Sequence, residues 1–242
     1  MKIYVVGIGP GSYEEMSVKA IKAIEESEVI VGYDGYIKLI ENLTEGKEVY
    51  SSGMKKERER CEKAVEFALS GKKTAVISSG DAGIYGMAGL IYEMCEKYED
   101  MEIEVISGIT ACSSAASRLG APIMNDFAVI SLSNLMTPWE IIEKRIKMAA
   151  EADFVICIYN PSSKKRVDNL KKACEYILNY RSEDTVCGYV KNIAREGEEY
   201  EITTLGKMKD TKTDMFTTVM IGNSTTKVIN GKMVTPRGYV IK

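Results

Sequence analysis

The feature that most constrains the fold is a repeated order in the first half of the chain. A short β-branched run is followed by a turn rich in glycine or serine, and then by a segment with helical spacing. The five turns are Gly7–Ser12, Gly32–Gly35, Ser51–Gly53, Ser79–Gly83 and Ser107–Ala111. Strands that alternate with helices form a parallel sheet covered on both faces, and ligands bind outside the carboxyl ends of its strands. The order therefore predicts an α/β domain with a ligand site at these turns.

The second half of the chain has a different order of expected strands and helices. In the first half, strands are expected near residues 3–6, 29–31, 48–50, 74–78 and 102–106, and helices near 17–27, 36–43, 56–69, 84–98 and 110–119. In the second half, strands are expected near 128–132, 154–159, 186–190, 199–204 and 217–221, and helices near 139–150 and 166–180. The last strands have few helices between them, which favours a mixed sheet. Gly120 and Pro122 stop the preceding helix. We therefore expect two α/β domains, 1–119 and 120–242.

Composition excludes several classes of site. The chain has no histidine, which removes Ser-His and Cys-His nucleophile pairs and every imidazole metal site. None of its six cysteines forms a C-x-x-C pair, so no zinc ribbon is expected and the thiols should be free in a reducing cytosol. The net charge of −3 argues against a dedicated nucleic-acid binder. No run of about 18 apolar residues exists, so no membrane span is expected. We expect a cytoplasmic protein with no protein-bound metal.

The first turn superficially resembles a dinucleotide site. Gly7, Gly9 and Gly11 follow a strand, and Asp34 lies where a ribose-binding acid would stand. However, the spacing is G-x-G-P-G-S, and Pro10 removes a backbone N–H where a pyrophosphate needs one. No P-loop motif occurs. A nicotinamide oxidoreductase is therefore a weak alternative, and a second alternative is that the glycines only make tight strand-to-helix turns.

Several stretches taken together resemble the tetrapyrrole methylase family, whose members use S-adenosylmethionine. The matching stretches are VVGIGPGS, VGYDGY, SSGDAGIYGMAG and SGITACSSAASRLGAP. Three later stretches resemble the branch that methylates C17 of precorrin-3B or cobalt-factor III in cobalamin biosynthesis, with ring contraction: ISLSNLMTPWEIIEKR, DFVICIYNPSSKKR and the region from DMFTTVMIGNSTT to MVTPRGY. Another precorrin methylase, such as the C11 enzyme, is the nearest alternative, and a non-catalytic binding module is a more distant one.

The resemblance implies a homodimer of two-domain subunits with S-adenosylmethionine in a cleft between the domains. The donor contacts it implies in the first domain are Pro10, Ser79, Gly80, Asp81, Ile84, Thr110 and Ala111. Those it implies in the second domain are Asn160, Ile193 and Thr217 or Thr218. For Asp81, the alternative role is an N-cap of the helix expected at 84–98.

The resemblance also suggests where substrate chemistry takes place. Asp34 matches a position that some members use for acid–base work, although it could equally be a turn residue. A substrate with many carboxylates needs basic partners, and the candidates are Lys164, Arg166, Arg195 and Arg237. The chain departs from the family pattern at Ala82, Ser107 and Asn125. Asn125 stands where a histidine is usual, and it cannot titrate near neutral pH, so we assign no proton shuttle there.

Overall fold

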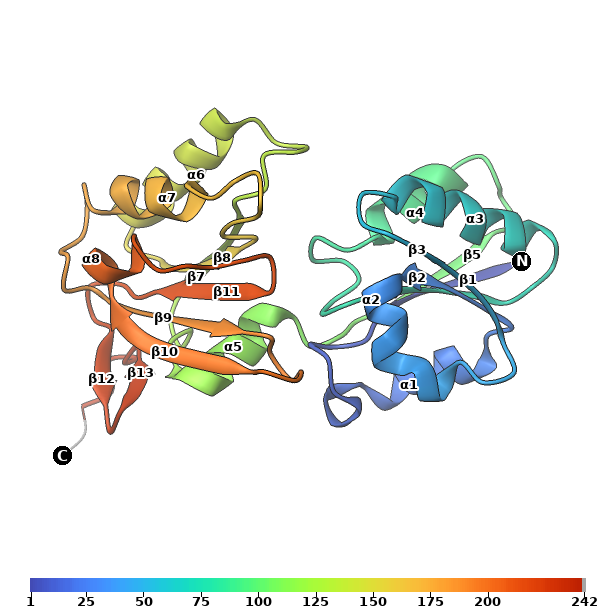
Figure 1. Ribbon diagram of the computed structural model, residues 1–242, viewed down its shortest axis with the longest axis horizontal. Coiled ribbons are helices and arrows are strands. Elements are labelled where there is room, and N and C mark those ends of the chain that lie inside the picture. The colour runs from blue at the N-terminus through green and yellow to red at the C-terminus, as the bar shows by residue number, and fades with distance from the viewer. Residues whose placement is uncertain (241–242) are drawn as a thin grey trace. The chain divides into compact units, whose positions relative to one another are not determined.

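The computed structural model describes residues 1–240, and the chain divides into two compact units (Figure 1). The first unit is Met1–Ala111, and the second begins at Cys112. The boundary expected from the sequence lies after residue 119, whereas the observed division lies after Ala111. Helix α5 (Ala111–Leu119) therefore belongs almost wholly to the second unit.

The first unit is built on a parallel five-stranded sheet in the order β3-β2-β4-β1-β5. The strands are β1 (Lys2–Gly7), β2 (Val29–Tyr33), β3 (Glu48–Ser52), β4 (Thr74–Ser78) and β5 (Glu102–Ile106). The helices are α1 (Val18–Glu26), α2 (Asp34–Ile37), α3 (Glu57–Leu69) and α4 (Ala88–Cys95), with 3-10 helices η1 (Tyr13–Glu15) and η2 (Lys38–Leu43). The connection that follows β1 leads to β2, towards one edge of the sheet, and the connection that follows β4 leads to β5, at the other edge. These two adjacent strands therefore form the switch point, where α/β sheets bind ligands.

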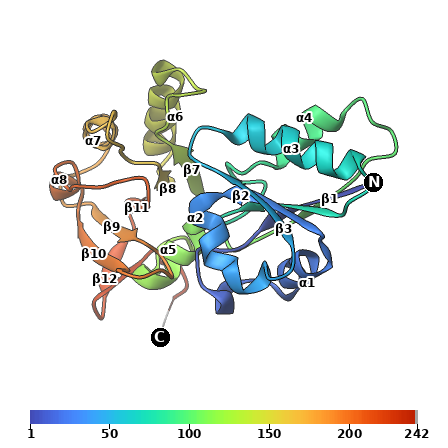
Figure 2. The same ribbon diagram turned by 45° about the vertical axis from the view of Figure 1, so that its right-hand side comes forward.

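The alternation of side chains along the strands produces two cores, one on each face of this sheet. Val5 and Val76 face α3 and α4, whereas Val6 and Ile77 face α1 and η2. Both views show α3 and α4 on one face of the sheet and α1 on the other (Figures 1 and 2). Because both faces are covered, the open edge at the carboxyl ends of the strands remains as the place for a ligand.

The second unit contains a mixed five-stranded sheet in the order β10-β9-β11-β8-β7, in which only β7 and β8 are parallel. The strands are β7 (Phe127–Ser131), β8 (Val155–Tyr159), β9 (Val186–Lys191), β10 (Glu199–Thr204) and β11 (Thr217–Ile221). Helices α6 (Trp139–Glu151), α7 (Asn169–Ile177) and α8 (Leu205–Met208) pack on one face through Ile142, Ile146, Leu170 and Leu205. This confirms the expected mixed α/β architecture.

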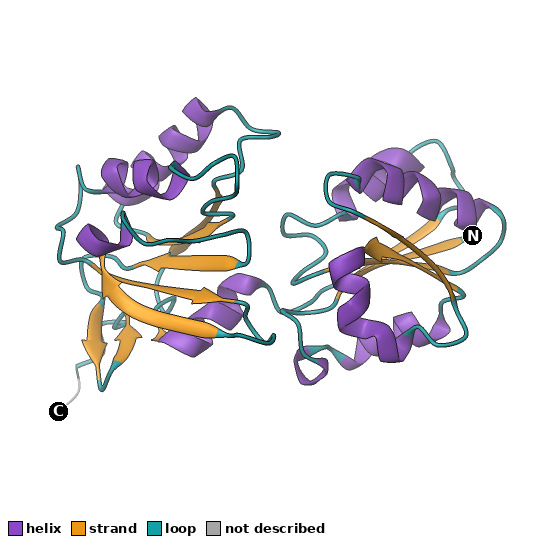
Figure 3. Cartoon of the chain, viewed as in Figure 1, coloured by secondary structure: helices purple, strands orange, loops and turns teal. Residues whose placement is uncertain are grey.

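The opposite face of this sheet receives α5. Leu119 lies against Gly188 of β9, where a Cβ would come within 2.7 Å of the leucine Cδ2 atom. A small sheet of β6 (Gly120–Ala121), β12 (Lys227–Ile229) and β13 (Lys232–Val234) follows, with β13 parallel to β6 (Figure 3). The sequence pattern does not predict this sheet, because each strand has only two or three residues.

Two expected helices are longer than the observed ones. The helix expected at 84–98 spans Ala88–Cys95, and that expected at 166–180 spans Asn169–Ile177. In the first case Gly83 and Gly86 flank Tyr85, whose φ of 55° is left-handed. Left-handed backbone cannot continue a right-handed helix, so the segment before Met87 remains a loop.

Candidate active site

The loops after β1 and β4 are joined backbone to backbone. The amide of Gly9 donates to the carbonyl of Gly80 at 3.1 Å, and the amide of Gly80 donates back to the carbonyl of Gly9 at 2.7 Å. The amide of Ile8 donates to the carbonyl of Ser78 at 2.9 Å. The first and fourth turns therefore form one rigid unit at the switch point of the sheet.

Glycine is required here because the loops approach so closely. A Cβ on Gly108 would lie 2.1 Å from the carbonyl oxygen of Gly80, and a Cβ on Gly7 would lie 2.7 Å from the amide nitrogen of Gly108. Gly80 itself has a left-handed φ of 67°, and a Cβ there would find nothing nearer than 3.7 Å. The third loop, after β5, thus packs against the first two, and Gly80 is buried among them.

Asp81 fastens the loop after β4 to the loop after β5. Its Oδ1 accepts from the amides of Gly83 at 2.8 Å and Ile84 at 3.1 Å, and its Oδ2 accepts from the amide of Gly108 at 3.0 Å. Since α4 begins only at Ala88, the N-cap alternative for Asp81 is wrong. Oδ1 thus uses both of its lone pairs, whereas Oδ2 still has acceptor capacity for a ligand donor beyond the Gly108 amide.

The remaining donor candidates of the first unit surround this loop cluster. Pro10 is buried directly after Gly9, and Ser79 precedes Gly80. The backbone of Thr110 and Ala111 lies beside Gly80, at 3.8 and 3.7 Å from a Cβ built there. The apolar side chains of Ile84 and Ile109 are 41% and 44% exposed on the same loops. A carboxylate acceptor and exposed apolar groups together fit a ligand with both polar and apolar parts, such as S-adenosylmethionine.

The donor candidates of the second unit lie at one edge of its sheet. Ile158 pairs with Val219 and Lys191 pairs with Thr217, so the ends of β8 and β9 share an edge with the start of β11. This brings Asn160 and Thr217 to the same edge, with the loop that carries Ile193 after β9.

Protein contacts already hold several of these groups. The side-chain amide of Asn160 donates through Nδ2 to the hydroxyl of Ser131 at 3.0 Å, and the hydroxyl of Thr217 donates to Oδ1 of Asp214 at 2.9 Å. Thr218, the neighbouring residue on β11, is 5% exposed. A direct contact of the Thr217 hydroxyl with a ligand would compete with Asp214.

The loop at Ile193 has an unusual backbone. Ile193 is 6% exposed, and its neighbours Asn192 and Ala194 have left-handed φ values of 50° and 55°. The side chain of Glu198 accepts from the Ala194 amide, and that of Asn192 donates to the carbonyl of Gly197. Left-handed alanine is strained, and such strain concentrates at functional sites. The outlier supports a functional role for this loop.

No sequence pattern predicts a role for the Tyr159 hydroxyl. This hydroxyl accepts from the backbone amide of Cys112 at 2.6 Å. Cys112 is the second residue of α5, where helix amides have no partner within the helix. Tyr159 therefore fixes the first turn of α5, which begins at Ala111, directly after Thr110. The sequence offers only one indication of this role, the hydroxyl group of Tyr159 at the end of an otherwise apolar strand.

Asp34 lies at the carboxyl ends of the strands of the first sheet, as the loop cluster does. It follows β2, which lies next to β4 on the side opposite β1. It is the exposed first residue of α2, directly after β2. Its carboxylate thus faces solvent at the carboxyl end of a strand, where a proton acceptor could reach a bound substrate.

The four basic candidates have different environments. Arg166 is half-buried, and its guanidinium donates to the hydroxyls of Ser133 and Ser163. The guanidinium of Arg195 lies 5.9 Å from the centroid of the Phe216 ring. Lys164 and Arg237 are exposed. The structure thus holds Arg166 and Arg195 in defined positions.

The cysteines do not provide a nucleophile. All six are buried and unpaired. Burial raises the pKa of the Cys61 and Cys174 thiols to about 12, so both are protonated at neutral pH. Burial also raises the pKa of Cys157, whose thiol donates to Cys112 and lowers the pKa of Cys112.

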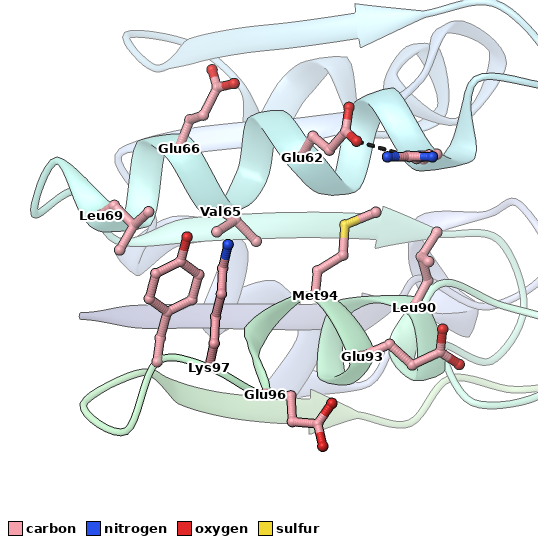
Figure 4. A pocket seen from close by; sticks show the side chains of 11 residues that line it. Glu62, Val65, Glu66, Leu69, Leu90, Glu93, Met94, Glu96 and Lys97 are labelled. Carbon is pink, nitrogen blue, oxygen red and sulfur yellow. Dashed lines mark hydrogen bonds and ion pairs between the residues drawn. The ribbon is translucent and has the colours of Figure 1, made fainter.

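A groove on the first unit lies away from the strand ends. It has a volume of about 760 Å³ and runs between α3 and α4, with Val65, Leu90 and Met94 along it and Glu62 and Glu93 at its rim (Figure 4). None of the candidate site residues lines it.

Within residues 1–240, no helix is long and apolar enough to cross a membrane, and no group of three or more Cys, Asp or Glu side chains is placed to hold a metal ion.

The chain is similar to proteins of one family. Residues 2–209 match the tetrapyrrole (corrin/porphyrin) methylases. A probable cobalt-factor III C(17)-methyltransferase of Salmonella typhimurium is 50% identical over 238 residues, which is 98% of this chain and 99% of that protein.

Solved structures agree with this match. The crystal structure of the methyltransferase CobJ superposes with a TM-score of 0.90 and 31% identity, covering 97% of this chain and 99% of the other. Uroporphyrin-III C-methyltransferase of Thermus thermophilus, solved with S-adenosylhomocysteine, has a TM-score of 0.74 over 92% of this chain and 97% of the other. At 18% identity, that likeness concerns the fold alone.

Proposed function

Because the chain belongs to the tetrapyrrole methylase family, we propose that it transfers a methyl group from S-adenosylmethionine to C17 of cobalt-factor III or precorrin-3B in cobalamin biosynthesis. The chain is a methyltransferase, and its relative of Salmonella typhimurium bears the name of the C17 enzyme. Ring contraction accompanies the transfer in this proposal.

The single structural observation that carries the proposal is the cluster of three loops after β1, β4 and β5. Gly80 joins the loops after β1 and β4 there, and Asp81 holds the loops after β4 and β5 together while its Oδ2 keeps acceptor capacity for a ribose hydroxyl or an ammonium group. We propose that Pro10, Ser79, Ile84, Thr110 and Ala111 complete the donor site on the first unit. Asn160, Ile193, Thr217 and Thr218 are our candidates for donor contacts on the second unit.

For methyl transfer, the protein mainly has to orient the donor and the acceptor. The sulfonium of the donor supplies an electrophilic methyl group, and the acceptor is an electron-rich ring carbon. Alignment of the two reactants alone can lower the barrier by several kcal/mol. Asp34 is our candidate for accepting a proton or a hydrogen bond from the substrate. Lys164, Arg166, Arg195 and Arg237 are candidates for binding its carboxylates.

Finer features of the biology are also part of the proposal. Six unpaired, buried cysteines are typical of a reducing compartment, so we propose that the enzyme acts in the cytoplasm. We also propose a homodimer, which light scattering would detect as twice the 26.8 kDa chain mass.

The decisive experiment is product analysis. The enzyme is incubated with methyl-labelled S-adenosylmethionine and either cobalt-factor III or precorrin-3B, and the label is located by NMR. We expect the label at C17. A label at C11, or transfer to neither substrate, would contradict the proposal. S-adenosylhomocysteine should raise the melting temperature, since a ligand at 100 times its Kd stabilises by about 2.7 kcal/mol, and NADH should not.

A further inference from the structure

Within the second unit, the loops after β7 and β8 form a connected cluster. The two strands are parallel and in register up to Ser131 and Tyr159, so the loops leave from the same edge. The side chain of Asn169 donates to the carbonyl of Leu132 at 2.8 Å. Together with the bond from Asn160 to Ser131, this contact fixes one loop relative to the other.

Arg166 is held in this cluster by hydroxyl groups. Its Nη1 donates to Oγ of Ser133 at 2.5 Å, and its Nε donates to Oγ of Ser163 at 3.0 Å. The backbones of Ser163 and Arg166 also exchange two hydrogen bonds, of 3.3 and 2.9 Å. A guanidinium has five N–H donors in a fixed plane. Two are used here, so the group is oriented and keeps three for a ligand.

The charge of Arg166 is not neutralised within residues 1–240. Its partners are neutral hydroxyls, and none of the ion pairs in that range includes it. The same loop carries Lys164 and Lys165 against the one acid Asp168. The buried arginines differ. Arg181, for example, donates to backbone carbonyls in the interior, which is a structural role.

The loop that carries Ser133 also exposes apolar side chains. Leu135 and Met136, which follow Ser133 in that loop, are 61% and 94% exposed. A fixed arginine, supported by a loop that exposes apolar groups, suits a ligand that carries a carboxylate on a flat apolar ring. Phosphate ligands in general do not need the apolar part.

We propose that Ser133, Ser163 and Arg166 form a subsite for one peripheral carboxylate of the tetrapyrrole, with Leu135 and Met136 covering the adjacent ring. This subsite rests on the proposed function, and it singles out Arg166 from the four basic candidates. A guanidinium binds a carboxylate through two parallel hydrogen bonds, which fixes orientation as well as affinity.

The first test is kinetic. Arg166→Gln should raise KM for the tetrapyrrole about tenfold or more and leave the Kd for S-adenosylhomocysteine unchanged. A double variant, Ser133→Ala with Ser163→Ala, should raise KM a few-fold, because the charge remains but its orientation is lost. Arg145→Gln is the matched control, since Arg145 is an exposed arginine on α6. An equal KM in Arg166→Gln and Arg145→Gln would overturn the subsite.

The second test does not depend on the reaction. Uroporphyrin, a stable octacarboxylate, is titrated into each variant and followed by fluorescence. Arg166→Gln should bind it at least several-fold more weakly than Arg145→Gln does, and equal affinities would reject the subsite. Failure of the proposed function would be recognised separately, as wild-type enzyme that binds uroporphyrin but methylates neither corrin precursor. Circular dichroism and melting temperatures establish that each variant is folded.

Discussion

Gly108 shows how a single missing side chain allows the three glycine loops to meet. Gly108→Ala would place a methyl group 2.1 Å from the Gly80 carbonyl oxygen, so the loops must separate. We expect a loss of about 1–3 kcal/mol in the free energy of unfolding, together with loss of S-adenosylhomocysteine binding. Urea unfolding and calorimetry measure the two effects. Gly53→Ala is the control, because nothing lies within 4 Å of its added Cβ.

Asp81 is the second residue whose role can be tested alone. Asp81→Ala removes the acceptor of three backbone amides and of the donor, so we expect the Kd for S-adenosylhomocysteine to rise at least tenfold, or about 1.4 kcal/mol. Asp100→Ala, which removes an exposed carboxylate of the same unit, should leave the Kd unchanged. An unaltered Kd in Asp81→Ala would reject the role in donor binding.

Asp34 should affect the reaction rather than donor binding. The substitution Asp34→Asn keeps the size of the exposed side chain and removes its ability to accept a proton. We expect an unchanged Kd for S-adenosylhomocysteine and slower methyl transfer in single-turnover assays. A wild-type rate would exclude Asp34 from the mechanism.

Among the secondary-structure elements, those with strong periodic patterns could be predicted from the sequence and the others could not. The strands Thr74–Ser78, Glu102–Ile106 and Thr217–Ile221 have the expected bounds, because each is a short β-branched run between polar turns. The helix expected from residue 84 begins at Ala88, because left-handed backbone at Tyr85 is not visible in a hydrophobic pattern.

The same limit applies to the candidate site. The glycine turns could be predicted, since strand ends meet at one edge of a parallel sheet. The use of Asp81 as a link between loops, and of Ser133 as a support for Arg166, depends on long-range contacts that no local pattern encodes.

At the level of a helix, the bond between Tyr159 and α5 can be tested. Tyr159→Phe leaves the amide of Cys112 without its acceptor, as the loss of a helix cap would. We expect about 1 kcal/mol lower stability in thermal or urea unfolding. Tyr180→Phe, at a tyrosine that is 43% exposed, should change stability by less than half of that. Equal stability of the two variants would contradict the capping role.

For the whole molecule, the buried cysteines report on the integrity of both units. Cys61 and Cys95 lie in the first unit, and Cys112, Cys157, Cys174 and Cys187 lie in the second. We expect none of the six to react readily with a thiol reagent such as DTNB in the native protein, and all six to react in denaturant. Fast reaction of a native thiol would show that its unit opens locally.

The strand order of the first sheet also has a consequence for how the protein emerges from the ribosome. β2 and β3 are neighbours in both sequence and space, but β1 has only β4 and β5 beside it. During synthesis β1 therefore remains unpaired until β4 has been translated, up to residue 78. It gains its second neighbour, β5, only after residue 106. The donor loops, which need Gly7, Gly80 and Gly108 together, assemble only once nearly half of the polypeptide has been made. A nascent chain stalled before that point would expose an apolar strand that chaperones could recognise.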